Sequence, residues 1–259
     1  MSPGLVPVTL ALARRALRNA LRRPQFLAPL VIFPGLFLAV NVGGLHRTTD
    51  LPGFPVVGGF LDFQLAAAMT QSLLLGGISQ GLAAGIELEL GFFDRLAAAP
   101  IPRVALVLGR LLAGGVLAAF QVAFFLLLGI VFGAEIAAGF PGALVTLGIG
   151  IVSGFAFSAI GVALALRTGS AATLQGIFPL VFVILFLSSA FFPRPLLESP
   201  IDTVAEYNPL SYIADGLRAP IIDSLDATPV LEGLAAGGGL ALLCTLVAIG
   251  ALRGRLRES

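Results

Sequence analysis

Apolar runs of about twenty residues recur along the chain, and they constrain its fold more than any other feature. The chain has 259 residues, of which 58% are hydrophobic and only 11% are charged. Because a helix rises about 1.5 Å per residue, roughly 20 apolar residues cross a hydrocarbon core about 30 Å thick. The sequence lacks the short alternating segments that are typical of a membrane β-barrel. The pattern therefore predicts an all-α integral membrane protein.

Six of these runs are long enough to form transmembrane helices. We expect spans 1 and 2 within residues 26–86, at 26–45 and 60–86, and spans 3 to 5 within residues 104–192, at 104–132, 141–166 and 174–192. Span 6 is expected at 230–252. Pro29 and Pro34 should bend the first span unless neighbouring groups replace the hydrogen bonds that they remove. Gly150, Gly154 and Ser158 repeat at four-residue spacing in the fourth, a pattern typical of closely packed membrane helices.

Basic residues are all arginine, and their distribution predicts the orientation. Eleven of the fifteen lie before span 1, between spans 2 and 3, after span 4 or in the tail at 253–259, and Arg110 lies on the same side in the first turns of span 3. Arg47, Arg194 and Arg218 lie in the other loops. The positive-inside rule then predicts a multi-pass protein of the cell membrane with both termini in the cytoplasm.

The first helix is expected at residues 6–23, where four arginines share one arc of a helical wheel. One interpretation is an interfacial helix with its arginines among anionic headgroups. The other is a plain positive flank of span 1. A cleaved signal peptide is disfavoured, because the apolar run that follows is too long.

A charged segment that contains two prolines separates the second and third spans. Five charges lie within seventeen residues, namely Glu87, Glu89, Asp94, Arg95 and Arg103. We expect a short surface helix at about 87–99, because these charges cannot enter lipid, and a turn fixed by the prolines that follow. A partner outside the bilayer is expected to dock on this segment, which covers residues 87–103.

Polar and aromatic side chains mark two further helix faces. Gln64 and Gln71 are seven residues apart in span 2, so they share a face that should turn away from lipid. Phe178, Phe182 and Phe186 form a stripe on span 5, which is either a packing or lipid-facing surface or an aromatic wall for an apolar cargo. We take these five residues as candidates for a substrate path.

The sequence disfavours an enzyme. A P-loop requires a lysine and the chain has none, so any ATP and Mg²⁺ would be bound by another polypeptide. The single histidine, His46, has no ligand neighbours in sequence, and no GxSxG or HExxH motif is present. We expect no catalytic residues, no metal, no cofactor in this chain and no nucleic-acid partner. Asp62 is expected to cap a helix rather than to relay protons.

Two segments carry a family resemblance. The sequence GIELELGFFDRLAAAPIPRVALVLGRLLAG resembles the cytoplasmic stretch of ABC-2 type permeases of the daunorubicin-resistance exporter kind. The sequence SSAFFPRPLLESPIDTVAEYNPLSYIADGLR is similar to the outer stretch of the same family. The resemblance implies a cytoplasmic coupling helix between spans 2 and 3 and outer re-entrant helices between spans 5 and 6, within residues 193–229.

The resemblance also implies roles for individual residues. The ATPase-coupling candidates are Glu87, Glu89, Gly91, Phe92, Phe93, Asp94, Arg95, Pro100 and Arg103. Phe92 and Phe93 replace a usual Thr-Leu pair, which bears on the choice of ATPase more than on the architecture, because aromatic side chains can seat in a pocket where polar contacts would otherwise form. The outer-gate candidates are Phe192, Pro193, Asn208, Pro209, Tyr212, Asp215 and Arg218. Asn208 and Pro209 should end one short helix and start another, and Asp215 could pair with Arg218 across one helical face.

The implied function is that of the permease subunit of an ATP-driven exporter of an apolar or amphipathic cargo, either drug-like or lipid. Its partners would be a cytoplasmic ABC ATPase, a second permease subunit and membrane lipids. One alternative is an exporter of a lipid-linked glycan or polysaccharide. The alternative from another class is an ATP-independent channel or secondary carrier, which would need buried functional charges or broken helices at mid-membrane.

Overall fold

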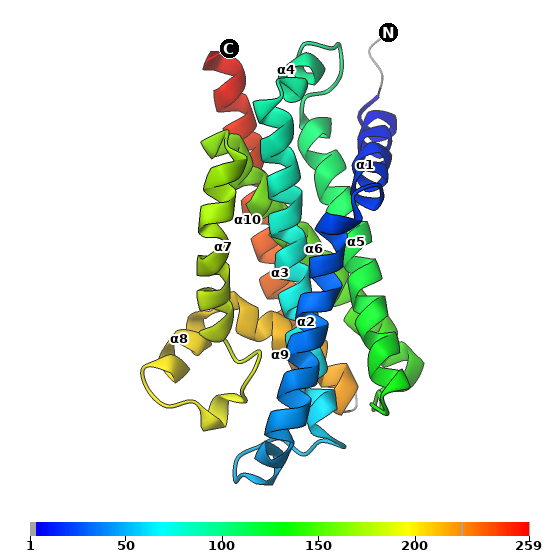
Figure 1. The fold of residues 1–259 in the computed structure, drawn as a ribbon, viewed down its shortest axis with the longest axis vertical. Helices are drawn as coiled ribbons and strands as arrows, with labels where there is room; N and C mark the ends of the chain where they lie inside the picture. Colours follow the sequence, from blue (N-terminus) through cyan, green and yellow to red (C-terminus); the bar gives the residue numbers. More distant parts are fainter. Residues whose placement is uncertain (1–3, 224, 259) are drawn as a thin grey trace.

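The protein is an elongated bundle of helices joined by turns and loops (Figure 1). The computed structural model describes residues 4–223 and 225–258, and the side chains of Phe26, Asp94, Ala97 and residues 256–258 lie outside that description. The α-helices are α1 (Leu5–Leu21), α2 (Pro24–Leu45), α3 (Phe60–Glu89), α4 (Phe92–Ala97), α5 (Val104–Val131), α6 (Gly139–Thr168), α7 (Ala171–Phe186), α8 (Ile201–Tyr207), α9 (Pro209–Ile222) and α10 (Ala227–Glu258). Two 3₁₀ turns, His46–Asp50 and Arg194–Leu196, lie in loops.

Helices α3 and α6 form the centre of the bundle. Helix α3 packs against α2, α5, α6, α7 and α9, and α6 packs against α3, α5, α9 and α10. Helices α2 and α10 lie at the periphery and leave most of their apolar surface uncovered by the rest of the chain. Both termini and α4 lie at one end of the bundle, and α8 and the His46–Asp50 turn lie at the other (Figure 1).

Four helices of the described chain, α2, α5, α6 and α10, are long and apolar enough to cross a membrane. Helix α3, with 30 residues, is as long as α6 but carries more polar side chains. Gln64, Thr70, Gln71, Ser72 and Gln80 on α3 are all buried, so neighbouring helices rather than lipid surround them. The central position of α3 therefore explains why its composition is unlike that of the peripheral helices.

Helix α7 is shorter than the expected span at 174–192. It contains 16 residues and ends at Phe186, and residues 187–193 form turns. At about 1.5 Å per residue, α7 is roughly 24 Å long, which is less than a hydrocarbon core of about 30 Å. The helix ends early because backbone carbonyls in and after its last turn bond to side chains of α3 and α9, as described below.

Small residues allow the helices to approach closely, as the four-residue spacing predicts. A Cβ on Gly150 or Gly154 of α6 would overlap side chains of α5, and a Cβ on Gly81 of α3 would lie 2.7 Å from the carbonyl oxygen of Gly161. On α5, a Cβ on Gly109 would lie 2.7 Å from the Cβ of Leu12, which shows how closely α1 packs on α5.

The first span contains its two expected prolines, and the structure shows how one of them is compensated. Pro34 has no N–H to donate to the carbonyl of Leu30, four residues earlier. The hydroxyl of Ser72, on α3, donates to this carbonyl at 2.5 Å. The side-chain amide of Gln121, on α5, donates in turn to the carbonyl of Ser72 at 3.0 Å. Polar groups on three helices thus satisfy one another away from water.

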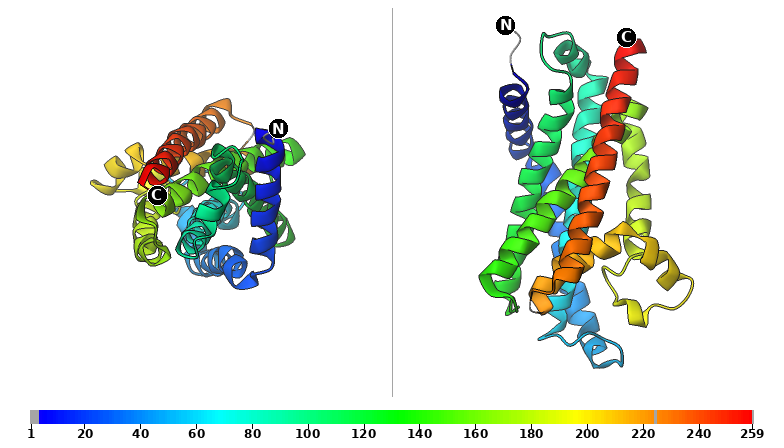
Figure 2. Two further views of the ribbon diagram at one scale, coloured as in Figure 1. Left: turned by 90° about the horizontal axis from the view of Figure 1, so that it is seen from above. Right: turned by 180° about the vertical axis from the view of Figure 1, so that it is seen from behind.

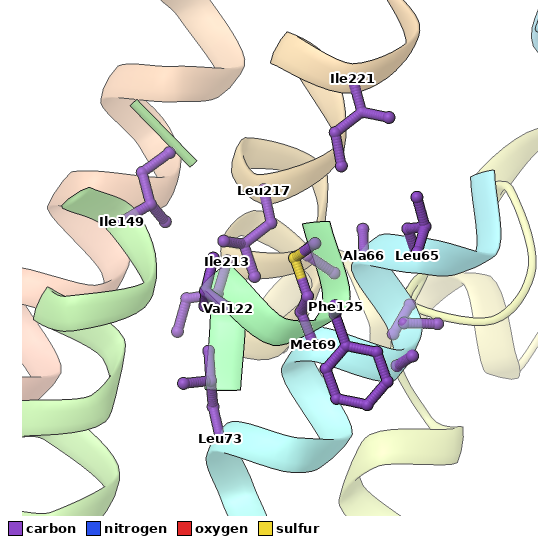
Figure 3. Packing of buried hydrophobic residues seen from close by; sticks show 14 of the residues in the cluster. Leu65, Ala66, Met69, Leu73, Val122, Phe125, Ile149, Ile213, Leu217 and Ile221 are labelled. Atoms are coloured by element: carbon purple, nitrogen blue, oxygen red, sulfur yellow. The ribbon is translucent and has the colours of Figure 1, made fainter. Parts of the chain in front are cut away.

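Two hydrophobic clusters hold the bundle together. The larger contains Leu65, Met69 and Leu73 of α3, together with residues of α5, α6 and α9 (Figure 3). Helix α9 contributes Ile213, Leu217 and Ile221, at spacings of four, so one face of this short helix inserts into the core. The smaller cluster lies at the end of the bundle that carries α4.

Helix α1 runs across the end of the bundle, as the view from above shows (Figure 2). Its small and apolar side packs on α5, where Ala13 is buried, and Arg14 and Arg22 are exposed. This arrangement suits a helix whose one face is covered by protein and whose other face carries positive charge.

Candidate functional site

The charged segment after α3 forms a short turn of helix, and it differs in extent from the helix expected at about 87–99. Helix α3 continues through Glu89, and Leu90 is its C-cap residue. Gly91 follows with a φ of 63°, a left-handed conformation that favours glycine. Helix α4 then covers only Phe92–Ala97. Glu87 and Glu89 therefore belong to the last turn of α3, because the chain reverses at Gly91.

Glu87 lies inside a three-residue ion-pair network rather than on a docking surface. One carboxylate oxygen lies 3.1 Å from Nη2 of Arg15 on α1, and the other pairs with Nη2 of Arg110 on α5. Arg110 is buried, and Glu87 is its only acidic partner among the described residues. The carboxylate joins α1, α3 and α5.

Glu89 and the two phenylalanines also contact this chain. Oε1 of Glu89 accepts a hydrogen bond of 2.7 Å from the backbone N–H of Ala171, the first residue of α7. Phe93 is 3% exposed and packs in the smaller hydrophobic cluster. The guanidinium of Arg15 lies 3.9 Å from the ring centroid of Phe92. The bundle itself therefore buries the ring of Phe93, so this candidate coupling residue packs inside the chain rather than on its surface.

The surface that remains available is formed by Arg95, Pro100 and Arg103, which are exposed. These three residues lie on α4 and in the loop that leads to α5. The side chain of Asp94 lies outside the described residues. This surface, defined by Arg95, Pro100 and Arg103, is called the α4 surface below.

At the opposite end, Asn208 connects three helices. Its side-chain N–H groups donate to the carbonyls of Ile184 at 2.8 Å and Leu187 at 3.0 Å, at the end of α7. Its side-chain oxygen accepts from the N–H of Leu210 at 3.0 Å, which caps α9. Asn208 separates α8 from α9, and Pro209 is the first residue of α9, as the sequence predicts.

Arg218 is the buried anchor of the end opposite α4. Its guanidinium pairs with Asp215, three residues earlier on α9, as predicted from their spacing. The same group donates to the carbonyls of Phe63 at 3.3 Å, Ser189 at 3.2 Å and Ala190 at 2.6 Å, and it lies 3.9 Å from the ring centroid of Phe63. Burial lowers the pKa of Arg218 and Asp215 opposes the change, so this arginine keeps its charge.

The other outer-gate candidates occupy different environments. The hydroxyl of Tyr212 donates to the carbonyl of Glu206 at 2.7 Å and so joins α9 to α8. Pro193 is buried, and Phe192 is exposed. Arg194 lies 3.7 Å from a carboxylate oxygen of Asp202 and 3.6 Å from one of Glu206, which holds α8 against the loop before it.

Gln64 and Gln71 are buried on α3, as expected, but they differ in their hydrogen bonds. The amide of Gln64 donates to the carbonyl of Phe191 at 3.2 Å. Neither amide atom of Gln71 has a hydrogen-bond partner among the described residues, and the side chain adjoins a small gap that faces Phe182 and Leu185 of α7. Gln64 therefore anchors the outer loop, and Gln71 is left with unused hydrogen-bonding capacity.

The aromatic stripe of α7 lies opposite two rings of α2. Phe182 is 5.6 Å from Phe33 and Phe186 is 6.0 Å from Phe37, in edge-to-face arrangements measured between ring centroids. Phe178 lines a cleft of about 520 Å³ between α2, α3 and α7. The walls of this cleft are almost entirely apolar.

Sequence reasoning missed two of the residues that organise these sites. Arg15 and Arg110 both reach Glu87, over separations that no local pattern reveals. One signal was available, because Arg110 begins an otherwise uncharged run and a charge at that position requires a partner.

These features define the class of protein: a helical, multi-pass membrane protein with a small charged helix at the end of the bundle that carries both termini. The sequence profile of the ABC-2 type transporter family matches residues 7–222, so the chain belongs to that family. It is similar to the daunorubicin resistance ABC transporter permease protein DrrB1 of Streptomyces coeruleorubidus, with 24% identity over 218 residues that cover 82% of this chain and 74% of the relative. It is also similar to ycf38 of Porphyra purpurea, which is described as a proposed transport permease, with 26% identity over 216 residues that cover 80% and 72% of the two chains.

Proposed function

We propose that the chain is the membrane subunit of an ATP-driven exporter that moves an apolar or amphipathic cargo, drug-like or lipid, away from the cytoplasm. Membership of the ABC-2 type transporter family implies association with an ABC ATPase subunit. ATP and Mg²⁺ would bind to that subunit, and a second permease subunit would complete the complex. The name of the relative from Streptomyces coeruleorubidus supports a drug-like cargo.

The proposed topology has six spans, formed by α2, α3, α5, α6, α7 and α10. Helix α3 would cross the membrane inside the bundle, where its polar side chains avoid lipid, and α7 would cross it together with the turns that follow. Both termini and α4 would face the cytoplasm across the plasma membrane, in agreement with the distribution of arginines.

The observation that carries the proposal is the position of the α4 surface. It lies outside the apolar part of the bundle, at the end that carries both termini, with Arg95, Pro100 and Arg103 exposed. Phe93 packs α4 into the smaller hydrophobic cluster with residues of α3 and α5, and the pair of Glu87 with Arg110 joins those two helices, so a force on α4 would be transmitted to both. ATP binding can shift the permease between its states only if the closed ATPase prefers one position of this surface.

The proposed cargo path follows the seam between α2 and α7, over α3. Its features are the apolar cleft that Phe178 lines, the paired rings of α2 and α7, and the unpartnered amide of Gln71. An apolar wall with a few polar groups suits an amphipathic cargo.

The experiment is an ATPase and efflux assay on the complex purified with the ABC ATPase that copurifies from the native membrane. We expect Arg95→Glu to leave the amount of inserted permease unchanged, to weaken ATPase association, and to reduce efflux of daunorubicin from cells. A matched control is Arg47→Glu, which makes the same charge change in the loop at the opposite end. Equal efflux by the wild type and Arg95→Glu, or equal losses in both variants, would contradict the coupling role.

The orientation has a separate test. In a Cys244→Ser background, a cysteine at position 103 should react with a membrane-impermeant maleimide only after cells are opened, and a cysteine at position 47 should react in intact cells. The opposite labelling pattern would reverse the proposed topology.

A further inference from the structure

A basic pocket lies between α1, α3, α4 and α5, at the end of the bundle that carries both termini. Its volume is about 270 Å³. Among the described residues that line it, Arg15, Arg23, Arg95 and Arg110 are basic and Glu87 alone is acidic. Since Glu87 already pairs with both Arg15 and Arg110, the pocket keeps an excess of positive charge.

The pocket lies at the expected depth of lipid headgroups. Arg23 is the residue before α2, and the apolar stretch of α2 that could cross a membrane begins at Leu27. Helix α1, which forms one wall, runs across the end of the bundle (Figure 2). Arg14 and Arg18 on this helix are exposed. Basic pockets between helices at this level suit anionic headgroups.

An apolar extension continues from the pocket along α3. Ser79 borders both the basic pocket and the cleft of about 520 Å³ between α2, α3 and α7. Leu75, Ser79 and Leu82 line the cleft, and Ala83, Ile86 and Leu90 line the pocket. From Leu75 through Ser79, Ala83 and Ile86 to Leu90 the spacings are three or four residues, so these side chains form one stripe on α3. From Leu75 to Leu90 the stripe is about 22 Å long, close to half of a bilayer that is about 40–45 Å thick with its headgroups.

We propose that this pocket binds an anionic phospholipid of the adjacent leaflet, with its phosphate among the arginines and an acyl chain in the cleft beyond Ser79. Charge complementarity selects the headgroup, and the joined apolar cleft selects a molecule with a long chain. A segment of a soluble partner would satisfy the arginines, but it would leave the apolar cleft at hydrocarbon depth unfilled. The lipid is a resident of the membrane subunit rather than its cargo, although its acyl chain would occupy the cleft that the proposed cargo path also uses, and Arg95 belongs to the α4 surface as well. Lipid binding is therefore measured on the permease chain alone, without ATPase or export.

The test is lipid binding to the full chain, purified in a neutral detergent and depleted of lipid. Binding is measured by native mass spectrometry and by the shift in thermal unfolding. Three probes are compared: phosphatidylglycerol, phosphatidylcholine with the same acyl chains, and glycerol 3-phosphate. We expect phosphatidylglycerol to bind at least about tenfold more tightly than phosphatidylcholine, since several arginines contribute. Glycerol 3-phosphate should neither bind measurably nor displace it.

Two double variants locate the site. Arg23→Gln with Arg95→Gln removes two pocket charges that make no ion pair with Glu87, and it should reduce the preference for phosphatidylglycerol by about tenfold or more. Arg14→Gln with Arg22→Gln removes two exposed charges, one on α1 and one at its C-cap, that do not line the pocket, and it should keep the preference. Equal losses in the two double variants would overturn the proposal, because they would indicate diffuse surface attraction.

Two further results would also overturn it. Equal binding of the two lipids to the wild type would exclude headgroup selection, and displacement by glycerol 3-phosphate would assign the pocket to a free phosphate compound. A photoactivatable phosphatidylglycerol keeps the test independent of variant folding, because it should crosslink wild-type peptides from residues 15–23 or 79–95. Crosslinks confined to other segments would contradict the site.

Discussion

Glu87 offers the sharpest test of the structure, because its sequence context assigns it to a docking surface and its contacts assign it to internal packing. The side chains of Glu87, Arg110 and Arg15 are 18%, 9% and 36% exposed, respectively. In Glu87→Gln, Arg110 would remain buried without a counter-charge. Removal of one partner from a buried pair costs about 3–5 kcal/mol, whereas an exposed pair contributes about 0–1 kcal/mol.

We therefore expect Glu87→Gln to lower the free energy of unfolding by about 2–4 kcal/mol, the lower bound allowing for the partial exposure of Glu87. Glu87→Gln combined with Arg110→Met should recover most of this loss, because it leaves no unpaired buried charge.

The matched control is Glu198→Gln in the loop between α7 and α8, where the described residues provide no ion-pair partner for Glu198. This variant should change the free energy of unfolding by less than about 0.5 kcal/mol.

The assay is unfolding in mixed micelles by titration with sodium dodecyl sulfate, followed by circular dichroism because the chain has no tryptophan. Stability of Glu87→Gln equal to that of the wild type, with ATPase association lost, would refute the internal role. That result would place the carboxylate in the docking surface after all.

Three further predictions concern packing and hydrogen bonds. Gly77→Ala should lower the free energy of unfolding by about 1–3 kcal/mol, because the new Cβ would lie 2.5 Å from the carbonyl of Phe157. Gly148→Ala, with open space around the new Cβ, should raise the free energy of unfolding by up to about 1 kcal/mol in the same assay. Asn208→Ala should cost about 2–3 kcal/mol because two carbonyls of α7 and the cap of α9 lose their partner, and limited proteolysis should then cleave after α7 faster. Gln71→Leu should stabilise the protein by about 1–3 kcal/mol, because its buried amide has no partner among the described residues, and it should reduce daunorubicin efflux if the amide serves the cargo path. Unchanged proteolysis of Asn208→Ala would contradict the role of Asn208 at the end of α7. A lower stability of Gln71→Leu would contradict the assignment of Gln71 as an amide without a partner.

Local chemistry was sufficient to predict several parts of the fold. The start of α3 and the bounds of α2, α5 and α6 agree with the expected spans to within about three residues, because apolar length and flanking turns determine them. The boundary at Asn208 and Pro209 and the pairing of Asp215 with Arg218 were also predicted, since both depend on residues that are close in sequence. In each case the physical cause lies within one helical turn or one span.

Other features required the tertiary structure. Phe93 has the sequence context of a surface helix, yet it is buried because α3 and α5 converge on it. Helix α7 stops at Phe186 although apolar residues continue. The side chains of Asn208, Arg218 and Gln64 donate hydrogen bonds to backbone carbonyls in its last turn and in the turns that follow, in place of the backbone N–H groups of a longer helix. These partners are 21 to 127 residues away along the chain, so only packing brings them within hydrogen-bond distance.

The same distinction applies to the charges of the α4 end. The amino-acid sequence shows that this segment is too polar for lipid, and it predicts that arginines gather on its side of the membrane. Which of these charges are available depends on helix packing, because Glu87 is held by Arg15 and Arg110 while Arg95 and Arg103 stay exposed. A carboxylate in a mostly apolar bundle is most stable beside a buried guanidinium, and the choice of that partner depends on how α1, α3 and α5 pack.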